Sequence, residues 1–570
     1  MRASRLNSPR AGTLWNRRFE ILFAVAAMVA VALLLYLGRW LTFYHDEWTF
    51  IDQRGEWTFD ALMRPHNEHW PLGMALAYKT LLSAVGLRSY LPYLLVLLLL
   101  HVATAAGLYR VLKHLSGPAF ALAGSTLLLF IGSAYENLYW GFQIGWVGST
   151  AAGTWAVALL LLPKTRRRLI LAAILLVVSV ASQGTGLFFF AGATVILLAD
   201  PERRSDVWVV APAAILGTAW FVFLGRSSIS SNRDPFTLES LSHLPEYVST
   251  GVVNAIGVLT GLGQPVGLVI FGLLAVATVW HLVGKAPMRA AAVAGFVGLI
   301  AQFSLTGLVR VGQATSSRYV YTAAIFLLFA FSGWLGRRYI GSGLRGYGAL
   351  GLLWLGALLF NGSVLWIGRG IFETHAIETR AAITLIERLG GSPAIPADEG
   401  LYPIPGRDRL AEFAMYGSPM EDPLLGMAPP VPARVLDDVL YRLVADDLTV
   451  AAVDELPVGT ALPEVTRSGD VSIRGIGPCV DVDPTGPDPR VTFAVPAGSS
   501  LALRVTLGGE MEAFLTLYDE ASDETDSLLF WAAPSVPYLL TTPDIGNAVW
   551  QVRMDPPPTT TTRICGVAAS

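Results

Sequence analysis

Residues 21–48 read ILFAVAAMVAVALLLYLGRWLTFYHDEW. A membrane-spanning helix needs about 20 consecutive apolar residues, and the run 20–41 is long enough to supply one. Asp46 and Glu47 follow the run directly. Carboxylates beside hydrocarbon are energetically costly, so those that occur there are commonly functional. The stretch therefore predicts a membrane protein whose first helix ends at a pair of candidate catalytic carboxylates.

The composition of the whole chain supports a membrane protein. Hydrophobic residues make up 53% of 570 and charged residues 15%, and the mean hydropathy is +0.52, whereas soluble domains carry about 25% charged residues. The net charge is −3, and no basic block points to a nucleic-acid partner. Apolar runs fill 20–367, and 370–570 is rich in Pro, Asp and Thr. We expect a cytoplasmic tail at 1–19, a membrane domain at 20–367 with an outer loop at 43–89, an extracytoplasmic connector at 368–469 and a mainly-β domain at 470–570.

Positive charge in short loops marks the cytoplasmic side of a membrane protein. The N-terminal arginines therefore predict a cytoplasmic N-terminus, and we interpret 20–41 as a retained helix rather than a signal peptide. Residues 71–87 are expected to form an amphipathic helix, and 225–264 a polar outer loop. A re-entrant hairpin broken at 182–186 is the alternative to two spans within 169–199. About eleven spans are predicted: 20–41, 90–109, 118–134, 143–162, two within 169–199, 207–224, 265–282, 290–308, 320–336 and 346–367.

This topology places the unusual polar residues on the outer face. They are Asp46, Glu47, His66, Glu68, His69, Glu136, Asn137, Gln143, Arg226, Arg310 and Arg318. Outer arginines at helix ends oppose the positive-inside rule, so Arg310 and Arg318 predict an anionic partner. A guanidinium is always charged and binds phosphate oxygens bidentately. The set predicts a site for a lipid phosphate and for a nucleophile that must lose a proton.

Each of these residues also has a purely structural interpretation. Asp46 and Glu47 can form a solvated helix end, and 66–69 a hydrogen-bonded loop. Glu136 and Asn137 can cap a helix, and Arg318 can snorkel to lipid headgroups. The tryptophans of the outer loops can belong to the aromatic belt or stack on sugar rings.

The C-terminal region changes pattern. A helix is predicted over 370–390, and strands over 490–495, 501–507, 513–518, 528–532 and 549–554, a spacing typical of a β-sandwich or jelly roll. Cys479 and Cys565 are the two cysteines of the chain. In an extracytoplasmic domain they predict a disulfide that joins the last strand to the first. The domain would bind glycan or cover the active site.

Several of these segments resemble the GT-C superfamily of membrane glycosyltransferases, which includes protein O-mannosyltransferases and the aminoarabinose and arabinofuranosyl transferases. Asp46-Glu47 follows the first span, and His69-Trp70-Pro71-Leu72 stands where family members carry a His-Pro-Pro-Leu-like motif before an embedded helix. Tyr135 to Gln143 is similar to a segment of bacterial members. The resemblance covers the architecture of 20–367.

The resemblance implies a bacterial plasma-membrane enzyme that uses a polyprenyl-phosphate sugar donor. The acceptor would be a glycan, a lipid or a protein of the cell envelope. Asp46, with Glu47 beside it, would act as general base in an inverting displacement, and Arg310 or Arg318 would hold the phosphate. His66, Glu68 and His69 would orient the acceptor or bind a divalent cation.

Two other classes of function compete with the enzyme. A transporter or flippase of a lipid-linked glycan also needs outer arginines, but such proteins carry ionisable residues near the midplane and an internal repeat, neither of which the sequence displays. An envelope scaffold that presents the sandwich would leave the outer carboxylates unexplained.

Overall fold

The structure is a computed structural model, and the chain forms two compact units. One comprises 1–41 and 49–373, and the other 42–48 and 374–570. The structure describes these residues: 9–52, 54, 56–67, 69–227, 238–283, 289–340, 344–389, 392, 394–397, 406–444, 449–455, 464–505, 511–516, 528–533, 535–545, 548–557 and 561–567.

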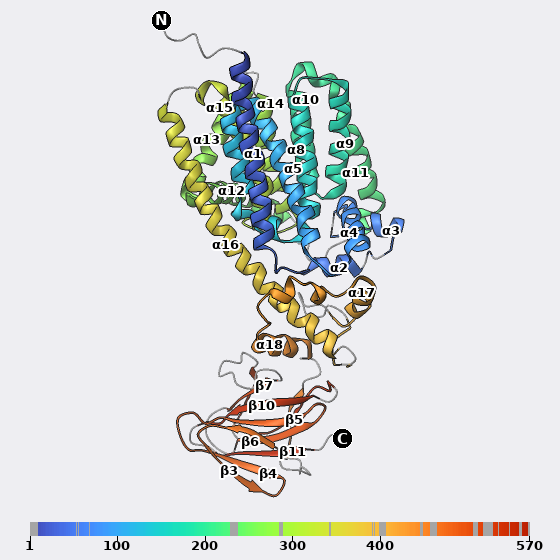
Figure 1. Cartoon of the computed structure of the whole chain (residues 1–570), viewed down its shortest axis with the longest axis vertical. Coiled ribbons are helices and arrows are strands. Elements are labelled where there is room, and N and C mark those ends of the chain that lie inside the picture. Colours follow the sequence, from blue (N-terminus) through green and yellow to red (C-terminus); the bar gives the residue numbers. More distant parts are fainter. Residues whose placement is uncertain are drawn as a thin grey trace. The chain divides into compact units, whose positions relative to one another are not determined.

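The first unit is a bundle of helices that run side by side (Figure 1). The long helices are α1 (Pro9–Leu37), α4 (Leu72–Val85), α5 (Leu91–Ser116), α6 (Pro118–Leu129), α8 (Ile144–Leu161), α9 (Arg166–Ser182), α10 (Gly186–Ala199), α11 (Ala211–Phe223), α12 (Leu238–Thr260), α13 (Gly263–Val283), α14 (Arg289–Gly307), α15 (Ser317–Ile340) and α16 (Leu344–Leu389). The short ones are α2 (Asp46–Asp52), α3 (Phe59–Met63), α7 (Glu136–Tyr139) and the 3₁₀ turns η1 (Gly132–Ala134), η2 (Gly141–Gln143), η3 (Pro201–Val209) and η4 (Gly225–Ser227). Both α2 and α16 contribute residues to each unit.

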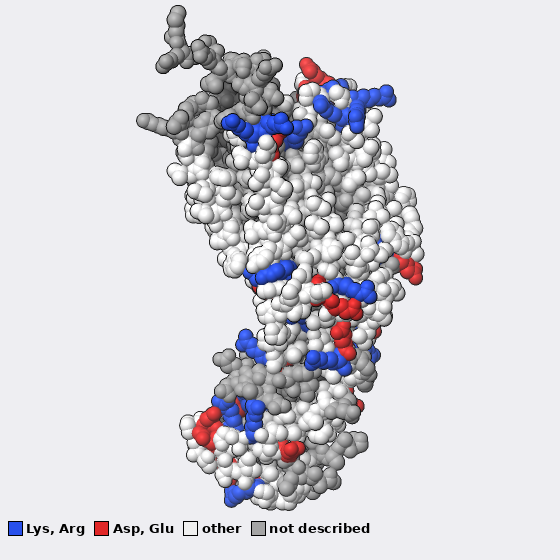
Figure 2. Space-filling view, in the orientation of Figure 1, with Lys and Arg blue, Asp and Glu red and all other residues white. Residues whose placement is uncertain are grey.

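The helical unit has the composition of a polytopic membrane protein. Within the described residues, seven helices are long and apolar enough to cross a membrane: Arg17–Leu37, Leu91–Ser116, Gly141–Leu161, Pro201–Phe223, Gly263–Trp280, Ala290–Gly307 and Gly351–Leu389. Shorter apolar helices occupy Pro118–Leu129, Gly186–Ala199 and Ser317–Ser332. Figure 2 shows few charged side chains on the middle of the visible face of the bundle and more at its two ends. Each predicted span overlaps a helix, but seven described helices rather than eleven reach spanning length, so the number of spans and the direction of insertion stay predictions.

The predicted break within 169–199 is observed. Helix α9 ends at Ser182 and α10 begins at Gly186. Gly186 is required at this point, because a Cβ there would lie 2.5 Å from the backbone of Ser179 and Val180. The close contact lets α10 turn back against α9, and the residues between the two helices enter the candidate site.

The expectation of a polar loop over 225–264 was wrong for most of that range. Residues 238–260 form α12, whose buried Val252, Ala255, Ile256 and Leu259 follow helical spacing. The helix packs on the end of α14 through Gly251, where a Cβ would meet the ring of Phe303 at 2.2 Å. Its polar first half masked this apolar face in the sequence. Arg233 and Asp234, part of the predicted loop, lie outside the described residues.

Helix α16 is one continuous element of 46 residues, where the sequence predicted a span over 346–367 and a separate helix over 370–390. Gly368 does not interrupt it. A Cβ at Gly368 would lie 2.4 Å from the side chain of Tyr135, so this glycine is required by close packing rather than by a turn.

Two buried cations organise the loop between α1 and α5. The Arg54 side chain is 2% exposed and donates to the carbonyl oxygens of Ala61 (2.6 Å) and Arg64 (2.6 Å). Lys79 on α4 donates to the carbonyl of Arg54 at 2.6 Å. Burial lowers the pKa of Arg54 to about 10, and the neighbouring Arg64 adds to this effect. Arg54 therefore remains charged at neutral pH and cross-links the loop through backbone acceptors.

The second unit contains a helical part and a β-sandwich. The helical part includes residues 374–389 of α16, α17 (Arg409–Tyr416), α18 (Ala433–Val444) and the 3₁₀ turns η5 (Pro419–Glu421) and η6 (Leu425–Met427). The strands are β1 (Thr449–Ala452), β2 (Glu464–Ser468), β3 (Val471–Ile476), β4 (Cys479–Pro484), β5 (Val491–Pro496), β6 (Ser500–Val505), β7 (Met511–Thr516), β8 (Leu528–Ala532), β9 (Pro537–Thr541), β10 (Val549–Asp555) and β11 (Thr562–Val567).

The strands form two antiparallel sheets in the described residues, in the orders β1-β9-β6-β11-β4-β3 and β2-β5-β10-β7-β8. Their inner faces share a core that includes the fully buried Val482, Leu503 and Ile564 of one sheet and Phe493 and Val552 of the other. The mainly-β domain is thus a sandwich, as predicted, and the five strands expected from the sequence are β5, β6, β7, β8 and β10.

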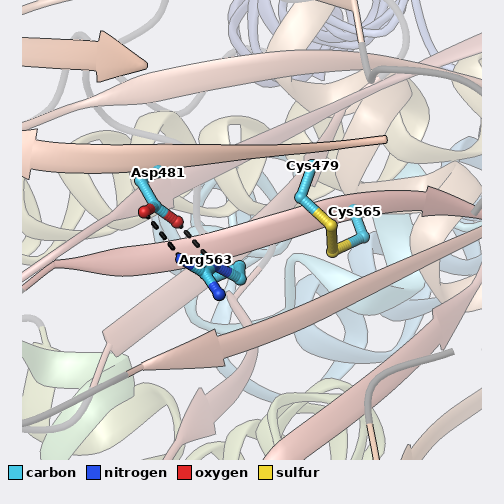
Figure 3. Close-up of a disulfide and its surroundings, with 4 residues drawn as sticks. All are labelled: Cys479, Asp481, Arg563 and Cys565. Carbon is cyan, nitrogen blue, oxygen red and sulfur yellow. Dashed lines mark hydrogen bonds and ion pairs between the residues drawn. A yellow bond between two sulfur atoms is a disulfide. The ribbon is translucent and has the colours of Figure 1, made fainter. Parts of the chain in front are cut away.

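A disulfide joins Cys479 to Cys565 (Figure 3). The two residues lie directly opposite each other on β4 and β11. Arg563 pairs with Asp481 on the same two strands through hydrogen bonds of 2.7 and 2.9 Å. The sequence predicted that the disulfide joins the last strand of the domain to the first. The structure instead fixes the last strand, β11, to β4.

Reduction of the disulfide should destabilise the sandwich. Its loop of 86 residues corresponds to roughly 4 kcal/mol in the chain-entropy model. We expect the urea midpoint for protease cleavage of the sandwich, in the full chain in micelles, to fall when reductant is added. A Cys479→Ser/Cys565→Ser variant should show the lower midpoint with or without reductant. An identical midpoint for oxidised and reduced wild type would contradict the prediction.

Candidate functional site

Two pockets lie at one end of the helical unit, and the segment 310–320 separates them. We name them the Trp220 pocket and the Glu136 pocket. Arg310 and Tyr319 line the Trp220 pocket, whereas residues 315–318 line the Glu136 pocket. The two outer arginines of the sequence analysis, Arg310 and Arg318, therefore belong to different sites.

The Trp220 pocket is a mainly apolar cavity of about 530 Å³. Its walls come from the start of α8, the break between α9 and α10, the first turns of α10, the length of α11, the end of α14 and the start of α15. The residues that matter most are His69, Trp70, Thr185, Trp220, Arg310 and Tyr319. An apolar cavity with a few polar groups at one place is the usual form of a small-molecule site.

A tight turn brings His69 and Trp70 to this pocket. His66 and His69 exchange backbone hydrogen bonds of 3.2 and 3.1 Å, and Asn67 takes a positive φ of 46° to close the turn. The His66 ring packs edge-on against Phe50 and Phe142. The turn is thus the hydrogen-bonded loop foreseen as the structural alternative, and it also carries His69 into the pocket lining.

Small and aromatic residues fix the two pocket side chains of this turn. A Cβ at Gly184 would lie 2.8 Å from Nδ1 of His69, so the glycine makes room for the imidazole. Trp70 stacks on Trp220 with ring centroids 5.7 Å apart and an interplanar angle of 4°. The indole of Trp220 donates to the carbonyl of Met63 at 3.0 Å, which holds α11 against the first loop.

Several groups suited to an anion line the Trp220 pocket. Arg310 contributes a permanent positive charge. Thr185 is 1% exposed, and its hydroxyl oxygen is buried without a hydrogen-bond partner in the described part of the chain. Thr185 directly precedes α10, a helix of 14 residues, and helix N-termini favour anions.

The Glu136 pocket has a volume of about 440 Å³, and its lining combines polar and apolar residues. Nε of Arg318 lies 3.5 Å from a carboxylate oxygen of Glu136. Ser317 donates to the other carboxylate oxygen at 3.0 Å, and Arg318 donates to the hydroxyl of Ser316 at 3.1 Å. The pair of opposite charges makes this pocket close to neutral, unlike the Trp220 pocket.

Asn137 and Gln143 point to each other rather than to either pocket. Both are buried, and the Asn137 amide nitrogen donates to the Gln143 side-chain oxygen at 3.1 Å. Arg226 is exposed on η4 and lines neither pocket. Glu68 lies outside the described residues.

The carboxylates of Asp46 and Glu47 have different environments. Glu47 is 0% exposed, and its carboxylate accepts a hydrogen bond from the backbone of Tyr44 at 2.9 Å. The Asp46 side chain is 27% exposed, and a carboxylate oxygen lies 2.7 Å from Nδ1 of His45. His45 adopts the left-handed backbone conformation, with a φ of 60°.

Aromatic contacts hold both halves of α2. In the second unit, Tyr44 stacks on His375 at 4.6 Å, and Trp48 packs edge-on against Phe413 at 6.0 Å. One turn after Asp46, Phe50 packs against Tyr78 in the first unit. Each of these aromatic contacts joins residues of a single unit.

The described residues contain no group of three or more His, Cys, Asp or Glu side chains placed to hold a metal ion. His66 packs between aromatic rings and His69 lies against Gly184. Glu68, the third residue of the predicted donor set, lies outside the described residues.

Four residues that the sequence did not single out also line the pockets: Thr185, Trp146, Trp220 and Asn254. Thr185 had a usable signal, because it is a hydroxyl residue in a predicted helix break. The others sit on helices whose facing directions depend on packing, so their residue types alone did not distinguish them from lipid-facing or core positions.

Comparison with known proteins finds no matching family model and no matching curated protein. A solved oligosaccharyltransferase from Archaeoglobus fulgidus, in complex with zinc and sulfate, is similar at 13% identity and a TM-score of 0.36. The match covers 74% of this chain, which spans 61% of the length of that structure. A TM-score this low does not establish a shared fold.

The contact between Asn137 and Gln143 predicts a stabilising rather than a ligand-binding role. Gln143→Leu leaves the Asn137 amide buried without its partner and should cost about 1–3 kcal/mol of unfolding free energy. A double-mutant cycle with Asn137→Leu, measured by SDS titration in mixed micelles, should give a coupling energy of about 0.5–1.5 kcal/mol. Gln313→Leu, a change at an exposed glutamine, serves as control. Purely additive effects of the two changes would contradict the assignment.

Proposed function

We propose that the protein is a membrane glycosyltransferase. In this proposal it moves a sugar from a polyprenyl-phosphate donor to a hydroxyl of an extracytoplasmic acceptor, with inversion at the anomeric carbon. The observation that carries the proposal is the Trp220 pocket, in which Arg310 and His69 line an apolar, aromatic cavity among membrane helices. The GT-C-like segments after the first helix support the same class.

A lipid-phosphate donor combines an apolar chain with an anionic head, and the Trp220 pocket offers complementary groups for both. The chain would pack on the rings of Trp220, Phe188 and Phe221. The phosphate would be held by Arg310, which can bond bidentately, and by the hydroxyl of Thr185. Electrostatic stabilisation of charge on the departing phosphate is commonly the largest catalytic contribution.

The geometry favours Arg310 over Arg318 as the phosphate ligand. Arg318 lies against Glu136 in the Glu136 pocket, and the carboxylate would oppose a second anion there. Arg310 instead lines a pocket whose other residues are mainly apolar and aromatic and could hold the polyprenyl chain of the donor. The ion pair of Arg318 with Glu136 thus supports Arg310 as the phosphate ligand, a choice that the sequence left open.

Asp46 is the proposed general base. The acceptor oxygen would attack the anomeric carbon, its proton would pass to the Asp46 carboxylate, and the bond between that carbon and the phosphate oxygen would break, with the electron pair leaving on phosphate. Glu47 is less suited to this role, because its carboxylate is buried on the Tyr44 backbone. His45 is a positioning residue, since its imidazole holds the Asp46 carboxylate.

Replacing Arg310 and Arg318 one at a time should show which of the two pockets binds the lipid phosphate. Arg310→Gln should weaken binding of a polyprenyl phosphate to the protein in nanodiscs by roughly 10- to 100-fold, the loss expected for a charge-assisted hydrogen bond. Arg318→Gln serves as the matched variant and should change affinity by only a few-fold. Native mass spectrometry gives both affinities. A larger loss in Arg318→Gln than in Arg310→Gln would overturn the assignment.

The role of Asp46 is tested by Asp46→Asn, which keeps the shape of the side chain but removes the proton acceptor. The rate of sugar transfer should fall roughly 100- to 10,000-fold, with donor binding unchanged. Asp52→Asn on the same helix, at an exposed carboxylate, should transfer at the wild-type rate. Transfer by Asp46→Asn at the wild-type rate excludes this base, and a wild type that binds donor without transfer favours a transporter instead.

A further inference from the structure

The Glu136 pocket contains a set of polar groups that lipid-phosphate binding does not use. Its lining includes Tyr135, Glu136, Asn254, Gln313, Ser317 and Arg318. These side chains come from the η1–α7 segment, α12 and the start of α15. Together they provide a carboxylate and hydroxyls that accept hydrogen bonds, and a guanidinium and amides that donate them.

The charges in this pocket balance. Glu136 and Arg318 form an ion pair with side chains that remain 20% and 33% exposed, so both can still reach a ligand. A free anion would meet the Glu136 carboxylate, and a free cation would meet the Arg318 guanidinium. Neighbouring hydroxyl groups of a neutral ligand suit the pair better, because one can donate to the carboxylate while the next accepts from the guanidinium.

The walls of the pocket are fixed before any ligand arrives. Asn361 on α16 is fully buried, and its side-chain oxygen accepts from the backbone (3.0 Å) and hydroxyl (2.8 Å) of Ser133. Its amide nitrogen donates to the carbonyl of Leu259 at 3.2 Å. One side chain thus joins α16, η1 and α12. A preformed polar site avoids much of the ordering cost of binding.

The pocket also offers apolar surface beside its polar groups. Phe360, Val258 and Val364 complete the lining. Burial raises the pKa of Tyr135, and the Glu136 carboxylate adds to this effect, so the phenol keeps its proton at neutral pH. A sugar ring, which has C–H faces and a rim of hydroxyls, matches such a mixed surface, and about 440 Å³ falls within the range of ligand pockets.

We propose that the Glu136 pocket binds a neutral saccharide, and that this saccharide is the acceptor of the transfer reaction. The acceptor role rests on the proposed function, whereas binding of the saccharide does not. The segment 310–320 then separates a donor pocket on one side from an acceptor pocket on the other.

Binding is measured on the full chain in nanodiscs without any polyprenyl phosphate. The probes are linear tetrasaccharides of mannose, glucose, galactose and arabinose, and the readout is saturation-transfer difference NMR with titration for affinity. We expect at least one tetrasaccharide to bind the wild type. Glu136→Gln should weaken that binding roughly 10- to 100-fold, the range for a hydrogen bond to a charged group.

Asn254→Leu changes a different wall of the same pocket and should also weaken saccharide binding. This second variant keeps the test valid if Glu136→Gln does not fold. Arg310→Gln in the Trp220 pocket should keep the saccharide affinity within about twofold, because its pocket is separate. Ser363→Ala, at an exposed serine on α16, controls for general effects of substitution.

The proposal is overturned if no tetrasaccharide binds, if a folded Glu136→Gln or Asn254→Leu variant binds as tightly as wild type, or if Arg310→Gln loses saccharide binding as well. Inorganic phosphate that binds the wild type and is lost in Arg318→Gln would identify an anion site instead. If the protein binds saccharide but transfers no sugar, the proposed function is wrong and the saccharide site stands. If it transfers sugar but this pocket binds no saccharide, the proposed function stands and the saccharide site is wrong.

Discussion

The cost of placing charge in hydrocarbon is the constraint on which the rest of this structure depends. It keeps charged side chains away from the middle of the helical unit and gathers them at its two ends (Figure 2). At the inner end predicted by the topology, Lys113 pairs with Glu20 at 2.7 Å. At the other end, the helices break, turn or stop, and both pockets lie there.

Breaks in the helices and close contacts at glycines shape the two pockets at this end of the helical unit. The break before Gly186 exposes Thr185 to the Trp220 pocket, and Gly184 makes room for His69. On the other side, Gly368 lets α16 approach Tyr135, and Asn361 ties η1 to α12. At Gly184, Gly186 and Gly368, a larger residue would disrupt the close packing that places these groups.

Much of the helical unit could be predicted from the sequence, because spanning length and charge placement are local properties of the chain. The break at 182–186 and the strands near 491–496 and 549–555 were predicted for the same reason. Helix α12 was missed, since its apolar face is one stripe on a helix that begins polar. The disulfide was predicted because the chain has two cysteines, but its pairing with β4 depends on strand order, which spacing does not determine.

The candidate site was predicted less completely. Sequence placed Arg310 and Arg318 together, whereas packing turns Arg318 and Tyr319, neighbours in the chain, toward different pockets. Asn137 and Gln143 were grouped with the ligand-binding residues because they are polar, but their contact with each other is a tertiary property. The difference in burial between Asp46 and Glu47 likewise arises from the loop that ends in His45.

The most direct test of the central claim is a cryo-electron microscopy structure of the full chain in nanodiscs that contain a short-chain polyprenyl phosphate. The account predicts lipid density in the Trp220 pocket, with a phosphate oxygen about 2.7–3.2 Å from the Arg310 guanidinium. It also predicts that the ion pair between Arg318 and Glu136 stays intact. Phosphate bound at Arg318, or a Trp220 pocket that remains free of lipid while the phosphate binds elsewhere, would contradict it.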